Sequence, residues 1–136
     1  MQRFVLDAWA ILAFLQREEP AAARVRELLE AAAQAQVQLL ISIINLGEVY
    51  YRVGKVKGEG EAQGTLDQLR RLAIAVIPAT EDVVLAAARL KMCHAISYAD
   101  AFAATAATTA RAILVTGDPE LAQLTDLLRI EKLERH

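Results

Sequence analysis

The chain has 136 residues, of which 55% are hydrophobic and 24% are charged, which is enough apolar content for one core in a single domain spanning residues 1–136. No apolar run reaches the roughly 18 uncharged residues of a membrane span and no signal peptide is recognisable, so a cytoplasmic protein is expected. Fifteen basic and 17 acidic side chains give a net charge of −2, which excludes a global basic field for nucleic acid, although local basic clusters occur at Arg52, Lys55 and Lys57 and at residues 70–71.

The first predicted element is an apolar strand over residues 4–6, followed directly by an apolar helix over residues 8–16. An apolar run without polar alternation favours a strand that is buried on both faces, as in a parallel sheet. Asp7 stands at the carboxyl end of this strand, where open α/β sheets bind ligands. Taken alone, Asp7 is better explained as the N-cap of the helix, a role that stabilises a helix by about 1 kcal/mol.

The next elements form a crossover and a second strand. Pro20 suits the start of a helix that extends to Gln34. A second buried strand is predicted over residues 37–41, and Ser42 is placed to cap the helix that follows. Gly54 is predicted to end that helix.

Three stretches suggest moving parts or contacts with partners. The Gly-rich and charged segment 54–64 predicts an exposed, mobile connection that is a candidate lid or partner contact. The apolar helix residues at 25–29 and 49–53 are candidates for a groove that binds a partner helix.

The second half of the chain continues the alternation with a helix around residues 66–72, a strand over 73–77, helices over 80–92 and 97–109, a strand over 112–115, a short helix from Asp118–Pro119 and an edge strand over 129–133. The alternation predicts a three-layer α/β/α domain with a mainly parallel sheet of four or five strands.

Four carboxylates recur at equivalent points of this alternation, at Asp7, Glu48, Asp100 and Asp118. Each has a structural alternative. Asp7 and Asp118 stand at N-cap positions, and Asp100 lies in a variant of the capping box. Glu48 is spaced for an ion pair with Arg52 on one helix face. Judged singly, none of the four requires a catalytic role.

The predicted topology brings the four acids to one edge of the sheet, because a helix that follows a parallel strand begins at the strand's carboxyl end. Two like charges about 4 Å apart repel by roughly 4 kcal/mol at an effective dielectric of 20, so such a cluster needs cations. Mg²⁺ or Mn²⁺ prefers oxygen ligands and supports phosphodiester hydrolysis. The Thr116 hydroxyl is a candidate for holding a metal-bound water or a substrate phosphate, and a bond to the backbone is its alternative.

The chain resembles the PIN-domain ribonucleases, specifically the VapC-type toxins of toxin–antitoxin pairs. The matching blocks are Phe4–Asp7, Ser42–Val49, Ile96–Phe102 and Leu114–Asp118, in this order. The resemblance implies a Mg²⁺- or Mn²⁺-dependent endoribonuclease, a homodimer, and inhibition by a cognate antitoxin protein. It also implies that the catalytic metal ligands are Asp7, Glu48, Asp100 and Asp118, with Thr116 as a hydroxyl neighbour.

One departure keeps an alternative function open. Members of this family often carry Ser, Thr or Asn after the first Asp, whereas this chain has Ala8 and Trp9. A catalytically degenerate PIN-like or receiver-like regulatory module is therefore the competing hypothesis. The receiver-like version is disfavoured because Asp7 has no acidic companion near the first strand. Trp9 is expected to pack in the core or a dimer interface rather than to stack on RNA.

Overall fold

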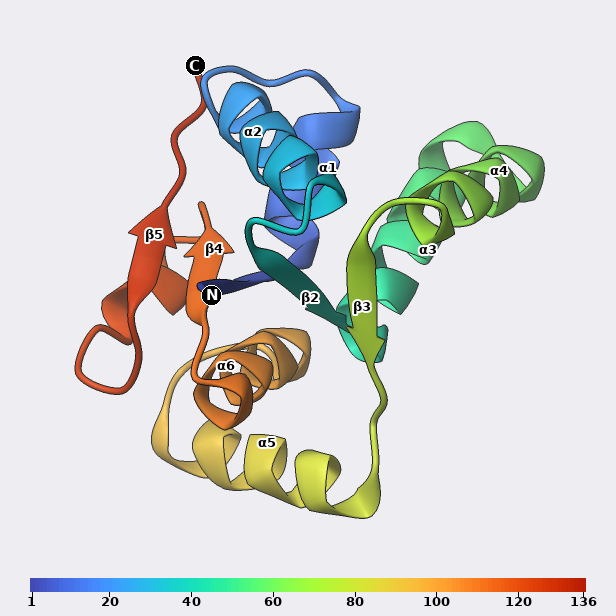
Figure 1. Cartoon of the computed structure of the whole chain (residues 1–136). Helices are drawn as coiled ribbons and strands as arrows, with labels where there is room; N and C mark the ends of the chain where they lie inside the picture. The colour runs from blue at the N-terminus through green and yellow to red at the C-terminus, as the bar shows by residue number, and fades with distance from the viewer.

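The computed structural model of the chain contains one sheet of five parallel strands in the order β3–β2–β1–β4–β5 (Figure 1). The strands are β1 (Arg3–Leu6), β2 (Gln38–Ser42), β3 (Ile74–Ile77), β4 (Ile113–Thr116) and β5 (Ile130–Lys132). The fifth, edge strand is therefore present, although it is shorter than the predicted range 129–133.

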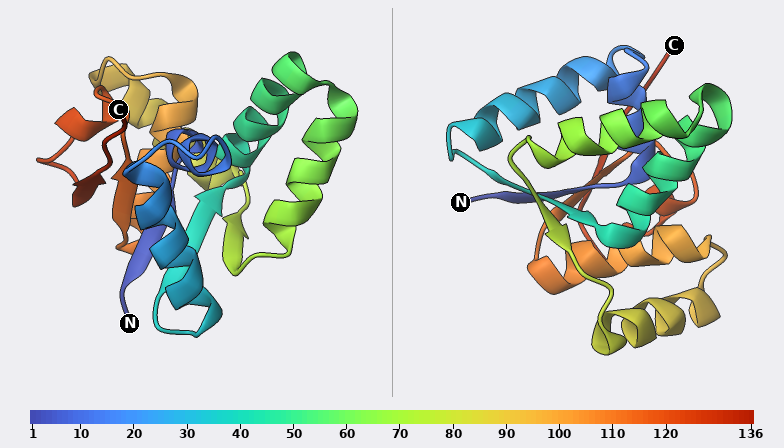
Figure 2. Two further views of the ribbon diagram at one scale, coloured as in Figure 1. Left: turned by 90° about the horizontal axis from the view of Figure 1, so that it is seen from above. Right: turned by 90° about the vertical axis from the view of Figure 1, so that its right-hand side faces the viewer.

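The helices are α1 (Ala8–Leu15), α2 (Ala21–Ala33), α3 (Ile43–Lys57), α4 (Glu59–Arg70), α5 (Glu81–Cys93) and α6 (Tyr98–Ala110), with a 3₁₀ helix η1 (Leu121–Gln123) before β5. Helices α1 and α2 cover one face of the sheet and α5 and α6 cover the other, while α3 and α4 form a hairpin beside it (Figures 1 and 2). The three-layer α/β/α prediction is confirmed. None of these helices is both long and apolar enough to cross a membrane.

The central strand β1 is buried on both faces, as its unbroken apolar sequence predicts. Phe4 and Leu6 pack into the core beneath α1 and α2, whereas Val5 packs into the second core beneath α5 and α6. In the neighbouring strand β4, Val115 and Leu114 divide between the two cores in the same way. The sheet therefore separates two apolar layers, and both anchor the strands that carry Asp7 and Thr116.

The strand order places the topological switch point between β1 and β4. From β1 the chain builds outward through β2 and β3, then returns to the other side of β1 to form β4. Leu6 pairs with Val115 in this ladder, so the next residues, Asp7 and Thr116, leave the sheet side by side. Open α/β sheets bind ligands in the crevice at such a point.

The prediction that Gly54 ends its helix is wrong, because α3 continues to Lys57 and ends at Gly58, which has a φ of 93°. Segment 54–64 is therefore the helical hairpin of α3 and α4 and not an irregular connection, although most of its residues are exposed as predicted. Gly54 lies where the helices meet, since a Cβ atom on it would lie 3.5 Å from Cβ of the buried Ala62. Tertiary packing here overrides the low helix propensity of glycine.

The predicted partner groove is wrong for residues 25–29, whereas part of the 49–53 segment does line a groove. Val25, Leu28 and Val49 are no more than 2% exposed and belong to the core beneath α1 and α2. These three side chains are therefore not available to a partner, whereas Tyr51 and Val53 of α3 line an open groove.

Candidate active site

Asp7 serves as a helix cap and as part of a buried polar network. Its Oδ1 accepts a hydrogen bond from the Ala10 amide at 2.8 Å, which makes it the N-cap of α1. Its Oδ2 accepts a hydrogen bond from the Thr116 hydroxyl. Asp7 is 2% exposed and Thr116 is fully buried. The structural and functional interpretations of Asp7 are therefore compatible with one conformation.

Thr116 connects Asp7 to the loop that follows β4. Its hydroxyl oxygen accepts a hydrogen bond from the Asp118 amide at 3.0 Å. Asp118 Oδ1 in turn accepts from the Glu120 amide at 2.8 Å, so residues 118–120 form a side-chain-stabilised turn. The predicted short helix does not begin at Asp118–Pro119, because this turn intervenes and the 3₁₀ helix η1 begins at Leu121.

Asp100 comes from the first turn of α6, and Glu48 comes from the second turn of α3. Ser97 caps α6 by accepting from the Asp100 amide at 3.1 Å, and Ser42 caps α3 as predicted. The buried Asn45 links the two helices, because its Nδ2 donates to the carbonyl of Ala99 at 3.0 Å. This bond fixes the start of α6 against α3.

The four predicted acids converge on one pocket of about 160 Å³, although they are up to 111 positions apart in the sequence. Asp7, Glu48, Asp100 and Asp118 all line it. Glu120 was not predicted as a site residue, yet its carboxylate oxygen lies within 4.8 Å of oxygens of Asp100 and Asp118. A carboxylate two positions after Asp118, in a turn, was the available sequence signal.

The electrostatics of the site reflect burial and crowding of carboxylates. Burial raises the pKa of Asp7 to about 7, the charges of Asp100 and Asp118 add to this shift, and hydrogen bonds from Thr116 and Ala10 oppose it. Burial also raises the pKa of Asp100 to about 6, and the charge of Asp118 contributes in the same direction. The pocket therefore resists full ionisation of its own side chains.

The pocket lining fits a hard divalent cation better than a soft one. Its carboxylates supply only oxygen ligands, and no histidine or cysteine lines it. Mg²⁺ and Mn²⁺ prefer such oxygen ligands. A cation would also offset the repulsion that raises the pKa values of Asp7 and Asp100. Asp100, Asp118 and Glu120 are the residues whose oxygens are already close enough to share one ion.

Trp9 packs closely against the loop of the site. A Cβ atom on Gly117 would lie 2.2–2.5 Å from atoms of the Trp9 ring, so only glycine fits at this position. Trp9 also lines the acidic pocket and is packed against the core beneath α1 and α2. The indole ring therefore supports the turn that holds Asp118.

We expect Gly117→Ala to destabilise the protein by about 1–3 kcal/mol, because the added methyl group overpacks the Trp9 ring. Gly47→Ala is the matched control, since nothing lies within 4 Å of a Cβ atom there and alanine favours helix α3. Urea unfolding of both variants measures the difference. Equal stabilities of the Gly117→Ala variant and the wild type would show that the close Trp9 contact does not hold in solution.

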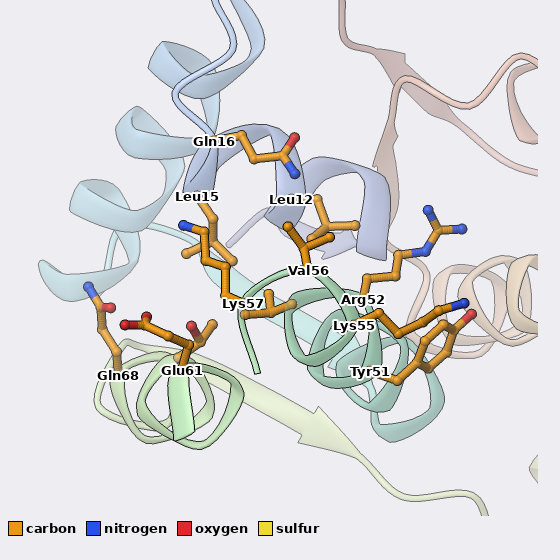
Figure 3. A pocket seen from close by; sticks show the side chains of 12 residues that line it. Leu12, Leu15, Gln16, Tyr51, Arg52, Lys55, Val56, Lys57, Glu61 and Gln68 are labelled. Atoms are coloured by element: carbon orange, nitrogen blue, oxygen red, sulfur yellow. The ribbon is translucent and has the colours of Figure 1, made fainter. Parts of the chain in front are cut away.

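A larger groove of about 710 Å³ adjoins the acidic pocket and shares Arg52 with it. Figure 3 shows Lys55 and Lys57 of α3 along this groove, with Glu61 and Gln68 entering from α4. The first predicted basic cluster thus lines one surface next to the acids. The second, at residues 70–71, does not line this groove.

Comparison with known proteins identifies the class of this fold and site. A family model described as "PIN domain" matches residues 4–127. The chain therefore belongs to the PIN-domain family, and this part of the resemblance is confirmed. No curated protein matches it by sequence.

Solved structures with the same fold include several toxin–antitoxin proteins. VapBC2 from Rickettsia felis bound to a promoter DNA fragment has a TM-score of 0.75 at 19% identity, with 98% of this chain and 100% of that chain covered. A toxin–antitoxin complex from Klebsiella pneumoniae has a TM-score of 0.69 at 18% identity, covering 97% and 98%. The sarcin–ricin-loop-cleaving toxin VapC20 from Mycobacterium tuberculosis has a TM-score of 0.72 at 14% identity, covering 89% and 94%.

Proposed function

We propose that this PIN-domain protein is a metal-dependent endoribonuclease that acts as the toxin of a VapBC-type pair. The observation that carries the proposal is the convergence of Asp7, Glu48, Asp100 and Asp118 on one pocket whose ligands are all oxygen. Its fold is shared with a sarcin–ricin-loop-cleaving toxin, which supports RNA as the substrate class.

The proposed chemistry assigns the four acids to metal binding. A bound Mg²⁺, or Mn²⁺ as the alternative, supplies charge stabilisation at the phosphate and lowers the pKa of the attacking water. Asp7 is held for this role by Thr116 and Ala10, so its carboxylate cannot rotate away. Thr116 acts by orienting Asp7 and Asp118, through one donated and one accepted hydrogen bond.

Purified protein should cleave RNA in Mg²⁺ or Mn²⁺ and lose this activity in EDTA. The assay incubates the protein with total RNA and resolves the products on a denaturing gel. The competing hypothesis, a degenerate binding module, predicts RNA binding or partner binding without cleavage in either metal. Cleavage that persists unchanged in EDTA would contradict the metal-dependent mechanism.

We also propose a homodimer and an antitoxin partner. The shared fold with the toxin–antitoxin complex from Klebsiella pneumoniae supports an antitoxin partner. Exposed apolar side chains support a subunit interface, among them Val76 on β3 and Leu85 and Met92 on α5, which are 41–80% exposed. Light scattering should give twice the chain mass of 14.9 kDa. A monomer at micromolar concentration would contradict the dimer.

A further inference from the structure

Two arginines line the acidic pocket, and they differ in what holds them. Arg52 forms an ion pair with Glu48, one of the pocket acids, at 3.2 Å. Arg135 reaches the pocket from the segment after β5 and pairs with none of the four acids. Arg135 is thus a cation at the site whose charge is not balanced by the proposed metal ligands.

Backbone hydrogen bonds on both sides fix the segment that carries Arg135. Leu133 is buried, and its amide donates to the Thr116 carbonyl at 2.8 Å. The Glu134 carbonyl accepts from the Ala21 amide at 2.9 Å. The His136 amide donates to the Glu19 carbonyl at 3.1 Å. The start of α2 and the end of β4 together set the position of Arg135.

The Arg135 side chain is held so that part of its guanidinium stays available. The guanidinium lies 4.8 Å from the centroid of the Trp9 ring, within the range of a cation–π contact. Nη1 donates to Glu18 at 3.0 Å, and no protein acceptor takes a hydrogen bond from Nη2 or Nε. The side chain is 48% exposed. The Trp9 ring therefore positions the guanidinium, and Glu18 occupies only one of its donors.

We infer that Arg135 is a substrate-binding residue that takes a phosphate group of the RNA backbone at the rim of the acidic pocket. The inference rests on the proposed function. Four carboxylates repel a phosphodiester, so a fixed cation beside them assists its approach. The planar guanidinium suits paired hydrogen bonds to phosphate oxygens. The Trp9 ring positions the Arg135 guanidinium beside the pocket.

The test compares Arg135→Gln with Arg26→Gln. Arg26 is the matched control because it is 50% exposed and pairs with Glu19 at 3.6 Å, away from the pocket. Arg135→Gln should weaken binding of fluorescein-labelled single-stranded RNA about tenfold, measured by anisotropy in Ca²⁺. It should also reduce the slope of log affinity against log salt by about 0.7, the value for one lost phosphate contact on single strands. Arg26→Gln should change neither quantity.

Glu18→Gln distinguishes a phosphate-binding role of Arg135 from a purely structural one, because the two roles predict opposite changes in RNA affinity. Removal of the Glu18 charge frees the guanidinium, so RNA affinity should rise about twofold to threefold if Arg135 binds phosphate. If Arg135 only clamps its segment, the same change loosens the clamp and RNA affinity should fall. Arg135→Lys should retain the salt slope, because it retains the charge.

The outcomes also distinguish this inference from the proposed function. Wild-type protein that neither binds nor cleaves RNA would overturn both. Wild-type protein that cleaves RNA, together with an Arg135→Gln variant of unchanged affinity and salt slope, would overturn the role of Arg135 alone. A fall in RNA affinity on Glu18→Gln would also overturn it. Cleavage kinetics should show the Arg135→Gln effect mainly in KM and not in kcat, since the residue binds at the rim.

Discussion

Asp118→Asn is expected to lower the rate of RNA cleavage about 100-fold or more while the protein stays folded. The substitution removes a carboxylate charge whose oxygen lies within 4.8 Å of those of Asp100 and Glu120. Loss of a metal ligand of this kind costs several kcal/mol of transition-state stabilisation, and 100-fold corresponds to about 2.7 kcal/mol. Steady-state cleavage rates in saturating Mg²⁺ measure the effect.

The hydrogen bonds that Asp118 makes within the protein can persist in this variant, so the variant tests the chemistry and not the folding. An asparagine retains an Oδ1 that can accept a hydrogen bond from the Glu120 amide. The hydrogen bond from the backbone amide of residue 118 to the Thr116 hydroxyl does not involve the substituted side chain. Circular dichroism should be unchanged. Asp126→Asn is the matched control, because Asp126 is exposed on the connection between β4 and β5 and does not line the pocket. Comparable cleavage rates for the two variants would remove Asp118 from the mechanism.

The sequence predicted the parts of the fold that depend on burial of regular elements. Strand β1 has an unbroken apolar run because both its faces are covered. Its identity therefore followed from this run, and its parallel pairing followed from the alternation of strands and helices along the chain. The meeting of Asp7 with Glu48 at one edge followed from parallel topology, in which strand ends and the following helix starts coincide.

The missed features depend on contacts between distant segments. The second half of helix α4 was predicted, but its first half contains Gly60 and Gly64, so local propensity argued against it. Packing of the buried Ala62 against α3 accounts for this part of the helix. Arg135 carries no local pattern of function. Its position follows from pairing of the last residues with the start of α2, a contact that no periodicity in the sequence encodes.

The free energy of unfolding of the metal-free protein should fall as the pH rises from about 4 to about 7. The pKa of Asp7 is raised from 3.8 to about 7 in the folded state, chiefly by burial. Between these values the folded state holds a proton that the unfolded state has released, so stability decreases with pH. The stability that protonated Asp7 contributes is fully present below pH 3.8 and is lost above about pH 7. For this pKa shift it amounts to about 4 kcal/mol at most. Asp100 contributes in the same direction.

Asp7→Asn should flatten this dependence and raise stability in EDTA at pH 8. Asparagine caps helices about as well as aspartate, so the bond to the Ala10 amide can persist while the buried charge is removed. Thermal melts at pH 5 and pH 8, in EDTA and in excess Mg²⁺, measure the pH dependence of stability and the stabilisation by Mg²⁺. Mg²⁺ should stabilise the wild type more at pH 8 than at pH 5, because protons compete for the same carboxylates, and should stabilise the variant less. If the variant instead loses the same stability at both pH values and responds to Mg²⁺ like the wild type, Asp7 is a helix cap alone.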